Sequence, residues 1–234
     1  AYMSKAIMAI PDRVAWRTMH SSIVEHGGFP TIVNTLAKFP QNVAVQYRGL
    51  EALHMLTKYR KLAGPLSQQN GVDAAIAAIA EICLSEDPEE NEKKKPQRKM
   101  YKDGVEIDAP PAKTGKKKNL KKVDPRARVL EQALQTLIRI GFYSKDARDK
   151  ISENNGVAAA VACMKIAGGN KDIHHYGAYL IGILCSDNKG NQEACFEEDA
   201  CEVIIDCLKR YPGDREVQLH ALWASVAVTN GHAS

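Results

Sequence analysis

One hydrophobic pattern occurs four times along the chain. Each copy begins with a small residue and continues with apolar residues one, five and eight positions later. These offsets place the apolar side chains on one face of an α-helix. The sequence therefore predicts four related amphipathic helices, which begin at Gly28, Gly71, Gly156 and Ala200.

A longer helical pattern follows each copy. A branched apolar residue is followed four positions later by a small residue, which would let a neighbouring helix approach closely. The branched residues are Val45, Val129, Ile173 and Val217, and the small ones are Gly49, Ala133, Gly177 and Ala221.

A shorter polar helix is expected before each starting residue. Residues 147–155 provide the example, because Asn155-Gly156 supplies the left-handed residue that ends a helix. Each copy then contains three helices. Because the alternation typical of strands is absent, we expect an all-α fold.

The starting residues are separated by 43, 85 and 44 residues, so the middle interval is about twice the other two. The excess corresponds to residues 86–123, which are charged and contain four prolines. We expect this segment to be an extended loop inserted into a single domain that spans residues 1–234.

A period of 42 to 44 residues with three helices per copy resembles the armadillo repeat family. HEAT repeats share the period but have two helices, and the short third helix favours armadillo. The resemblance implies a right-handed α-solenoid with about four registered copies and a partial N-terminal one. Residues 1–27 resemble the tail of a preceding repeat, and residues 224–234 stop where another would start, so we expect a piece of a longer array.

Armadillo proteins bind partners along a groove lined by the third helix of each repeat. In the nuclear-import receptors of the family, a Trp and an Asn recur on these helices. The Trp positions here hold Glu51, Gln135, Tyr179 and Trp223, and the Asn positions hold Met55, Arg139, Ile183 and Ala227. Since this ladder is missing, the resemblance disfavours a role in nuclear import.

We still expect a partner-binding groove, with aromatic and Arg side chains as its anchors. The alternative for Tyr179 and Trp223 is packing between repeats. The sequence thus predicts a non-enzymatic scaffold or adaptor that binds other proteins in a larger assembly. Its candidate groove residues are Tyr47, Glu51, Met55, Gln135, Arg139, Tyr179, Ile183, Trp223 and Ala227.

The insertion is strongly basic. Residues 93–122 contain twelve Lys and Arg against three acidic residues, a net charge of +9 in a chain of net +4. Three interpretations of this segment are open. It is a solvated loop, a nuclear-import signal, or an arm that docks on an acidic surface, such as that of tubulin in a ciliary or other microtubule assembly. Nucleic acid is the rival partner. The arm residues are Lys93, Lys94, Lys95, Arg98, Lys99, Lys116, Lys117, Lys118, Lys121 and Lys122.

No enzymatic, cofactor or metal site is expected. Adjacent helical residues such as His174 and His175 point about 100° apart, so one should pack and the other should face solvent. His54 and His220 are interpreted as structural or surface residues without a carboxylate or Cys at ligand spacing.

The cysteines predict a reducing compartment. The chain has six of them, none in a C-x-x-C pair, and most lie among apolar residues. We expect buried thiols and a cytoplasmic protein, with the cilium or cytoskeleton as the more specific location. The apolar stretch from Val72 to Leu84 is interrupted by Asp73 and Glu81, so no membrane span is predicted.

Overall fold

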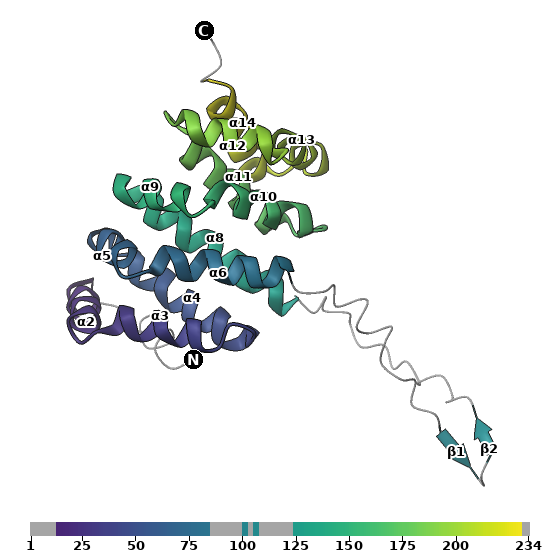
Figure 1. The fold of residues 1–234 in the computed structure, drawn as a ribbon, viewed down its shortest axis with the longest axis horizontal. Coiled ribbons are helices and arrows are strands. Elements are labelled where there is room, and N and C mark those ends of the chain that lie inside the picture. Colours follow the sequence, from purple (N-terminus) through teal and green to yellow (C-terminus); the bar gives the residue numbers. More distant parts are fainter. Residues whose placement is uncertain (1–12, 85–99, 103–104, 108–123, 231–234) are drawn as a thin grey trace. The chain divides into compact units, whose positions relative to one another are not determined.

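The computed structural model describes residues 13–84, 100–102, 105–107 and 124–230. These residues belong to two units (Figure 1). One unit is helical and is formed by chain on both sides of the insertion. The other lies within residues 84–123 and contains two short strands.

The helical unit is built from triplets of helices. Its first helices are α2 (Arg13–Glu25), α3 (Gly28–Lys38) and α4 (Val43–Thr57). A 3₁₀ turn, η1 (Arg60–Leu62), precedes α5 (Ala63–Gln68), α6 (Gly71–Leu84) and, after the insertion, α8 (Pro125–Tyr143). The remaining helices are α9 (Lys145–Glu153), α10 (Gly156–Ile166), α11 (Lys171–Cys185), α12 (Lys189–Glu197), α13 (Ala200–Arg210) and α14 (Arg215–Thr229). The three triplets that begin at α5, α9 and α12 each run from a short to a medium to a long helix. The predicted all-α character is confirmed for this unit.

Each starting residue of the repeated pattern opens a helix, as predicted. The residue before it has left-handed backbone, with φ of 75°, 62°, 58° and 60° at Gly27, Asn70, Asn155 and Asp199. This conformation turns the chain sharply between the short helix and the next one.

Glycine is required at three of these starts by a close approach. A β-carbon at Gly156 would lie 2.7 Å from the carbonyl oxygen of Ile151 and would also meet its side chain. Gly28 faces Ile23 and Gly71 faces Leu66 in the same way. The fourth copy has Ala200 instead, and there the residue five positions earlier is a cysteine, which is smaller than Ile or Leu.

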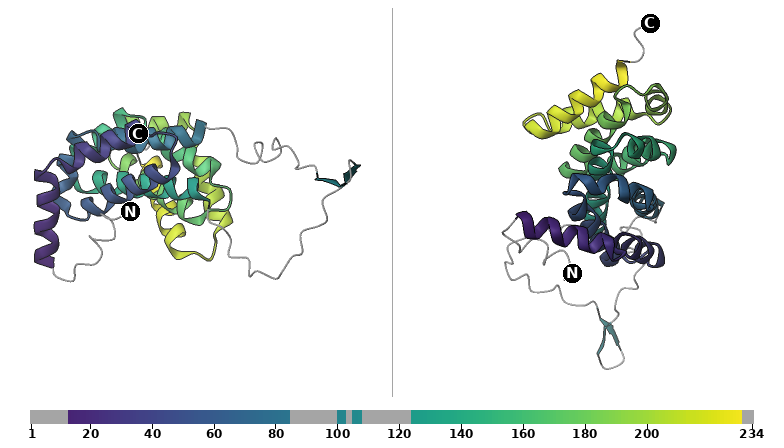
Figure 2. Two further views of the ribbon diagram at one scale, coloured as in Figure 1. Left: turned by 90° about the horizontal axis from the view of Figure 1, so that it is seen from below. Right: turned by 90° about the vertical axis from the view of Figure 1, so that its left-hand side faces the viewer.

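The long helices pack against one another in chain order. Helix α4 contacts α8, α8 contacts α11, and α11 contacts α14, and the right-hand view of Figure 2 shows the helices stacked in layers. Their predicted small residues admit side chains from the medium helices, since a β-carbon at Gly177 would lie 2.8 Å from Met164 Sδ. Buried Leu53, Leu137 and Leu184 contribute to one continuous apolar core.

Polar side chains complete the ends of these helices. An Asn or Asp caps each long helix by accepting backbone N–H groups. Gln46 of α4 donates to the carbonyl oxygens of Leu36 and Phe39, at 2.8 and 3.0 Å, where α3 ends. Gln218 of α14 repeats this arrangement at the end of α13. The caps are Asn42, Asp124, Asn170 and Asp214.

The expectation that strands are absent was wrong within the insertion. Strand β1 (Met100–Lys102) pairs antiparallel with β2 (Val105–Ile107), with Met100 opposite Ile107. The two intervening residues are Asp and Gly, a pair that favours the tight turns of two-residue hairpins. The predicted arm residues, Lys93 to Lys99 and Lys116 to Lys122, lie outside the described residues.

Within the described ranges, no helix has the length and apolar character needed to cross a membrane. This agrees with the prediction from the interrupted apolar stretches.

Candidate binding site on the long helices

The four long helices jointly line one cavity of about 380 Å³. Helix α8 supplies the largest share of its lining, and α4, α11 and α14 supply the remainder. The lining residues are His54, Gln135, Ile138, Arg139, Phe142, Tyr143, His175, Tyr176, Tyr179, Glu216 and His220. Residues more than 160 positions apart in the sequence, such as His54 and His220, therefore line the same cavity.

Three predicted groove residues, Gln135, Arg139 and Tyr179, lie in this cavity and are half-buried. The Arg139 side chain makes no hydrogen bond or ion pair with the part of the chain that the structure describes. Its guanidinium nevertheless acts on its surroundings, because it lowers the pKa of Lys58 in addition to the effect of burial. An Arg with unused donors beside an apolar wall is suited to a carboxylate partner.

Three other predicted groove residues are placed in the core. Met55 is 8% exposed, Ile183 is 4% exposed and Ala227 is 6% exposed. The prediction that Met55 and Ile183 face a groove was wrong, whereas Ala227 lines a separate cavity together with Trp223. Each lies four residues after a position with an accessible side chain, but the apolar stripe of the long helix is wide enough to include it.

The remaining predicted residues, Tyr47, Glu51 and Trp223, are not among those that line this cavity. The Tyr47 hydroxyl donates to Glu51 at 3.3 Å, and the guanidinium groups of Arg48 and Arg128 lie over the Tyr47 ring. Trp223 contacts Tyr179 with ring centroids 5.6 Å apart, and it lines a separate cavity. Both Tyr179 and Trp223 thus combine packing between helices with partial exposure.

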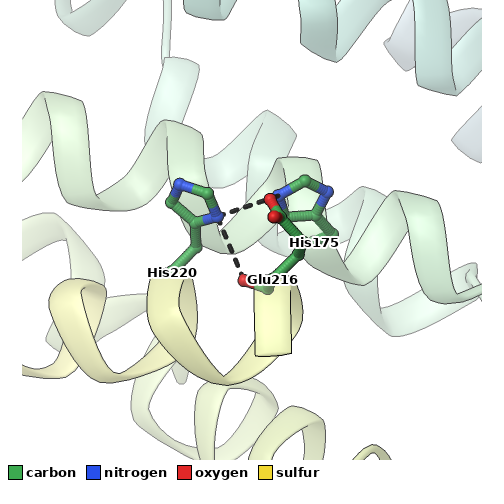
Figure 3. A group of neighbouring side chains, drawn as sticks. All are labelled: His175, Glu216 and His220. Atoms are coloured by element: carbon green, nitrogen blue, oxygen red, sulfur yellow. Dashed lines mark hydrogen bonds and ion pairs between the residues drawn. The ribbon is translucent and has the colours of Figure 1, made fainter. Parts of the chain in front are cut away.

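The sequence interpretation missed a cluster of His175, His220 and Glu216. His175 Nε2 lies 2.8 Å from His220 Nδ1, and 4.0 Å from a carboxylate oxygen of Glu216 (Figure 3). The view that His220 lacks a carboxylate at ligand spacing was wrong, because Glu216 precedes it by one helical turn. The four-residue spacing of Glu216 and His220 was visible in the sequence, whereas their proximity to His175 depends on the contact between α11 and α14.

Only part of the prediction for the adjacent pair His174 and His175 is confirmed. His174 is buried, and its Nδ1 lies 2.9 Å from the carbonyl oxygen of Asn170. His175 does not face solvent fully, since it packs against Tyr176 and His220.

Burial shifts the pKa values of several side chains that line the cavity. It lowers the pKa of His54 to about 4, aided by the positive charges of Arg139 and Lys58. It also lowers the pKa of His175 and His220 and raises the pKa of Tyr179. At neutral pH these imidazoles are uncharged, so Arg139 carries the positive charge of the cavity wall.

The cysteines are free thiols, as predicted. Four are buried, whereas Cys83 is half-buried and Cys201 is exposed. Cys185 and Cys195 lie with their sulfur atoms 3.2 Å apart, and this contact together with burial raises the pKa of Cys185. The raised pKa makes the Cys185 thiol a poor nucleophile.

No family model and no curated protein matches this chain. It is similar to a solved structure described as "Crystal Structure of Engineered Protein" from the Northeast Structural Genomics Consortium. The match covers 99% of this chain and 98% of the other, with 16% sequence identity and a TM-score of 0.47. A likeness of this degree carries no conclusion about function.

Proposed function

We propose that this chain is an armadillo-type scaffold whose long helices bind a segment of another protein. The single observation that carries the proposal is the cavity shared by α4, α8, α11 and α14. The recurring helix triplets, with the same left-handed turn before each medium helix, support the armadillo assignment.

The chemistry of the cavity favours a partner segment with both acidic and apolar groups. Arg139 offers unpaired guanidinium donors, and Phe142 and Tyr143 expose 53% and 40% of their surface. Aromatic and Arg side chains are the types that contribute most to binding energy at protein interfaces. A carboxylate would pair with Arg139 while apolar side chains cover the two rings.

The basic insertion is proposed as a second contact, on an acidic partner surface. Its net charge of +9 leaves about −5 for the remaining chain, so the arm is attracted to acidic surfaces that the remainder repels. An acidic protein surface such as that of tubulin, in a ciliary or microtubule assembly of the cytoplasm, would suit it.

The groove is tested by comparing pull-downs from cell extract with the full chain and with Arg139→Ala and Tyr179→Ala. Lys209→Ala, an exposed change on α13, is the control. We expect at least one partner to be retained by the control and weakened about 30-fold by each groove change, as for interface residues worth about 2 kcal/mol. Equal recovery by all variants would refute the groove.

The arm is tested by deleting residues 93–122 in the same assay. Loss of an acidic partner supports docking by the arm, and an unchanged partner set shows a passive loop. If the lost material is nucleic acid, and its binding falls steeply with salt, the alternative of a nucleic-acid-associated protein replaces the proposal for the arm.

A further inference from the structure

Three side chains of metal-ligating type converge where α11 meets α14. His175 comes from α11, and Glu216 and His220 come from α14 (Figure 3). One ligand atom from each residue lies within 4.8 Å of the other two. The i, i+4 spacing of Glu216 and His220 places both on one face of α14, which is the arrangement that helical metal sites use.

The distances suit a single tetrahedral ion. Zinc binds imidazole nitrogen at about 2.0–2.1 Å, so two donors to one tetrahedral ion are about 3.3 Å apart. His175 Nε2 lies 2.8 Å from His220 Nδ1 and 4.0 Å from a carboxylate oxygen of Glu216. The first distance is shorter than required and the second is longer, so a bound ion would move the two rings about 0.5 Å apart and draw the Glu216 carboxylate closer.

The surroundings hold the two rings in place and leave the carboxylate adjustable. Tyr179 stacks on His220 with ring centroids 4.1 Å apart, and Tyr176 packs on His175 at 4.8 Å. The Glu216 side chain is 71% exposed, so it is able to move toward the ion. Two ligands on packed rings and one mobile ligand lower the conformational cost of binding.

We propose that His175, Glu216 and His220 form a Zn²⁺ site. Nitrogen and carboxylate donors in this combination suit zinc. Three protein ligands leave a fourth position open, and the cluster lines the cavity described above. A water molecule or a side chain of a bound partner would occupy that position.

Zinc binding requires both rings to be neutral and the tautomer of His220 to change. Only neutral imidazole binds a metal, and burial lowers the pKa of both His175 and His220. The His220 Nδ1 atom also lies 3.1 Å from the carbonyl oxygen of Glu216. Zinc would displace the contact between the two rings, and the proton of His220 would then reside on Nε2.

The competing interpretation is a hydrogen-bonded histidine pair with no metal. Zinc titration of the full chain, stripped with chelator and kept reduced, distinguishes the two. A chromophoric chelator competes for the metal, and His175→Gln, His220→Gln and Glu216→Gln are compared with the unchanged chain. His26→Gln is the control, because His26 is exposed and lies outside the cluster.

We expect one equivalent of zinc per chain and an affinity that each cluster variant weakens by at least about tenfold, the lower bound for altered metal surroundings. The control should bind as the unchanged chain does. No zinc uptake, or uptake that all three variants retain, would overturn the site. Because Glu216 is exposed, Glu216→Gln tests the proposal even if a histidine variant fails to fold.

Cobalt substitution identifies the ligands independently of affinity. Co²⁺ in the site should show visible d–d absorption of a tetrahedral or five-coordinate ion, without the strong near-ultraviolet band that thiolate ligands cause. The visible bands should be lost in His220→Gln and kept in His26→Gln. A thiolate band that persists in the cluster variants would assign the metal to the cysteines and contradict the proposal.

Discussion

The residue that starts each medium helix is restricted by a residue five positions before it. At Gly156 the restriction comes from Ile151, whose carbonyl oxygen and side chain leave no room for a β-carbon. At Ala200 the corresponding residue is Cys195, which has a smaller side chain than Ile151. The sequence pattern predicted where these helices begin, but it did not reveal why glycine is needed, because the contact is between two helices.

Gly156→Ala should destabilise the chain by about 1–3 kcal/mol, the usual cost of forcing an atom into a packed site. Gly64→Ala is the matched control, since a β-carbon at Gly64 meets nothing within 4 Å and the residue lies within α5. The control should be neutral or slightly stabilising, because alanine favours a helix. Urea unfolding of both variants measures the difference, and equal midpoints would disprove the steric explanation.

His54 makes stability dependent on pH. Its folded pKa of about 4 lies below the ordinary 6.5, so between these values the unfolded chain binds more protons than the folded one. Stability therefore falls as pH is lowered through this window, and His54 contributes up to about 3 kcal/mol of the loss.

The free energy of unfolding of His54→Gln should therefore fall less between pH 6.5 and pH 4 than that of the unchanged chain. Urea unfolding at a series of pH values measures both slopes. Parallel curves would show that His54 does not carry this dependence.

At the scale of the helix, the ends are completed by polar residues that the apolar pattern does not report. The Asn and Asp caps of the long helices are visible in the sequence as individual residues. The role of Gln46 is not visible in the sequence, because its acceptors belong to the end of a different helix. The pairing of β1 with β2 shows the opposite case, since the Asp-Gly pair between the two strands was visible in the sequence although the charged surroundings favoured a loop.

Gln46→Leu should destabilise the chain by about 1–3 kcal/mol, because it leaves the carbonyl oxygens of Leu36 and Phe39 without their donor in a buried place. Gln135→Leu is the control, since Gln135 is half-buried on the equivalent type of helix. Thermal unfolding should separate the two variants. A Gln46→Leu chain as stable as the control would mean that water replaces the lost donor at no cost.

At the scale of the molecule, the period of the apolar pattern predicted the helix triplets, and the structure confirms their order. It could not predict the composition of the cavity, because His54, Arg139, Tyr179 and His220 come from four different helices. The depth of each side chain also depends on packing, which is why Met55 was assigned to the wrong face. Partner binding by the long helices remains the central claim.

Site-specific photocrosslinking tests that claim most directly. A benzophenone amino acid placed at Tyr179 in the cavity, and separately at exposed Lys209 on α13, is irradiated in cell extract. We predict a discrete covalent adduct from position 179 that is absent from position 209 and is reduced by Arg139→Ala. Adducts from position 209 alone, or the same adducts from both positions, would contradict the account.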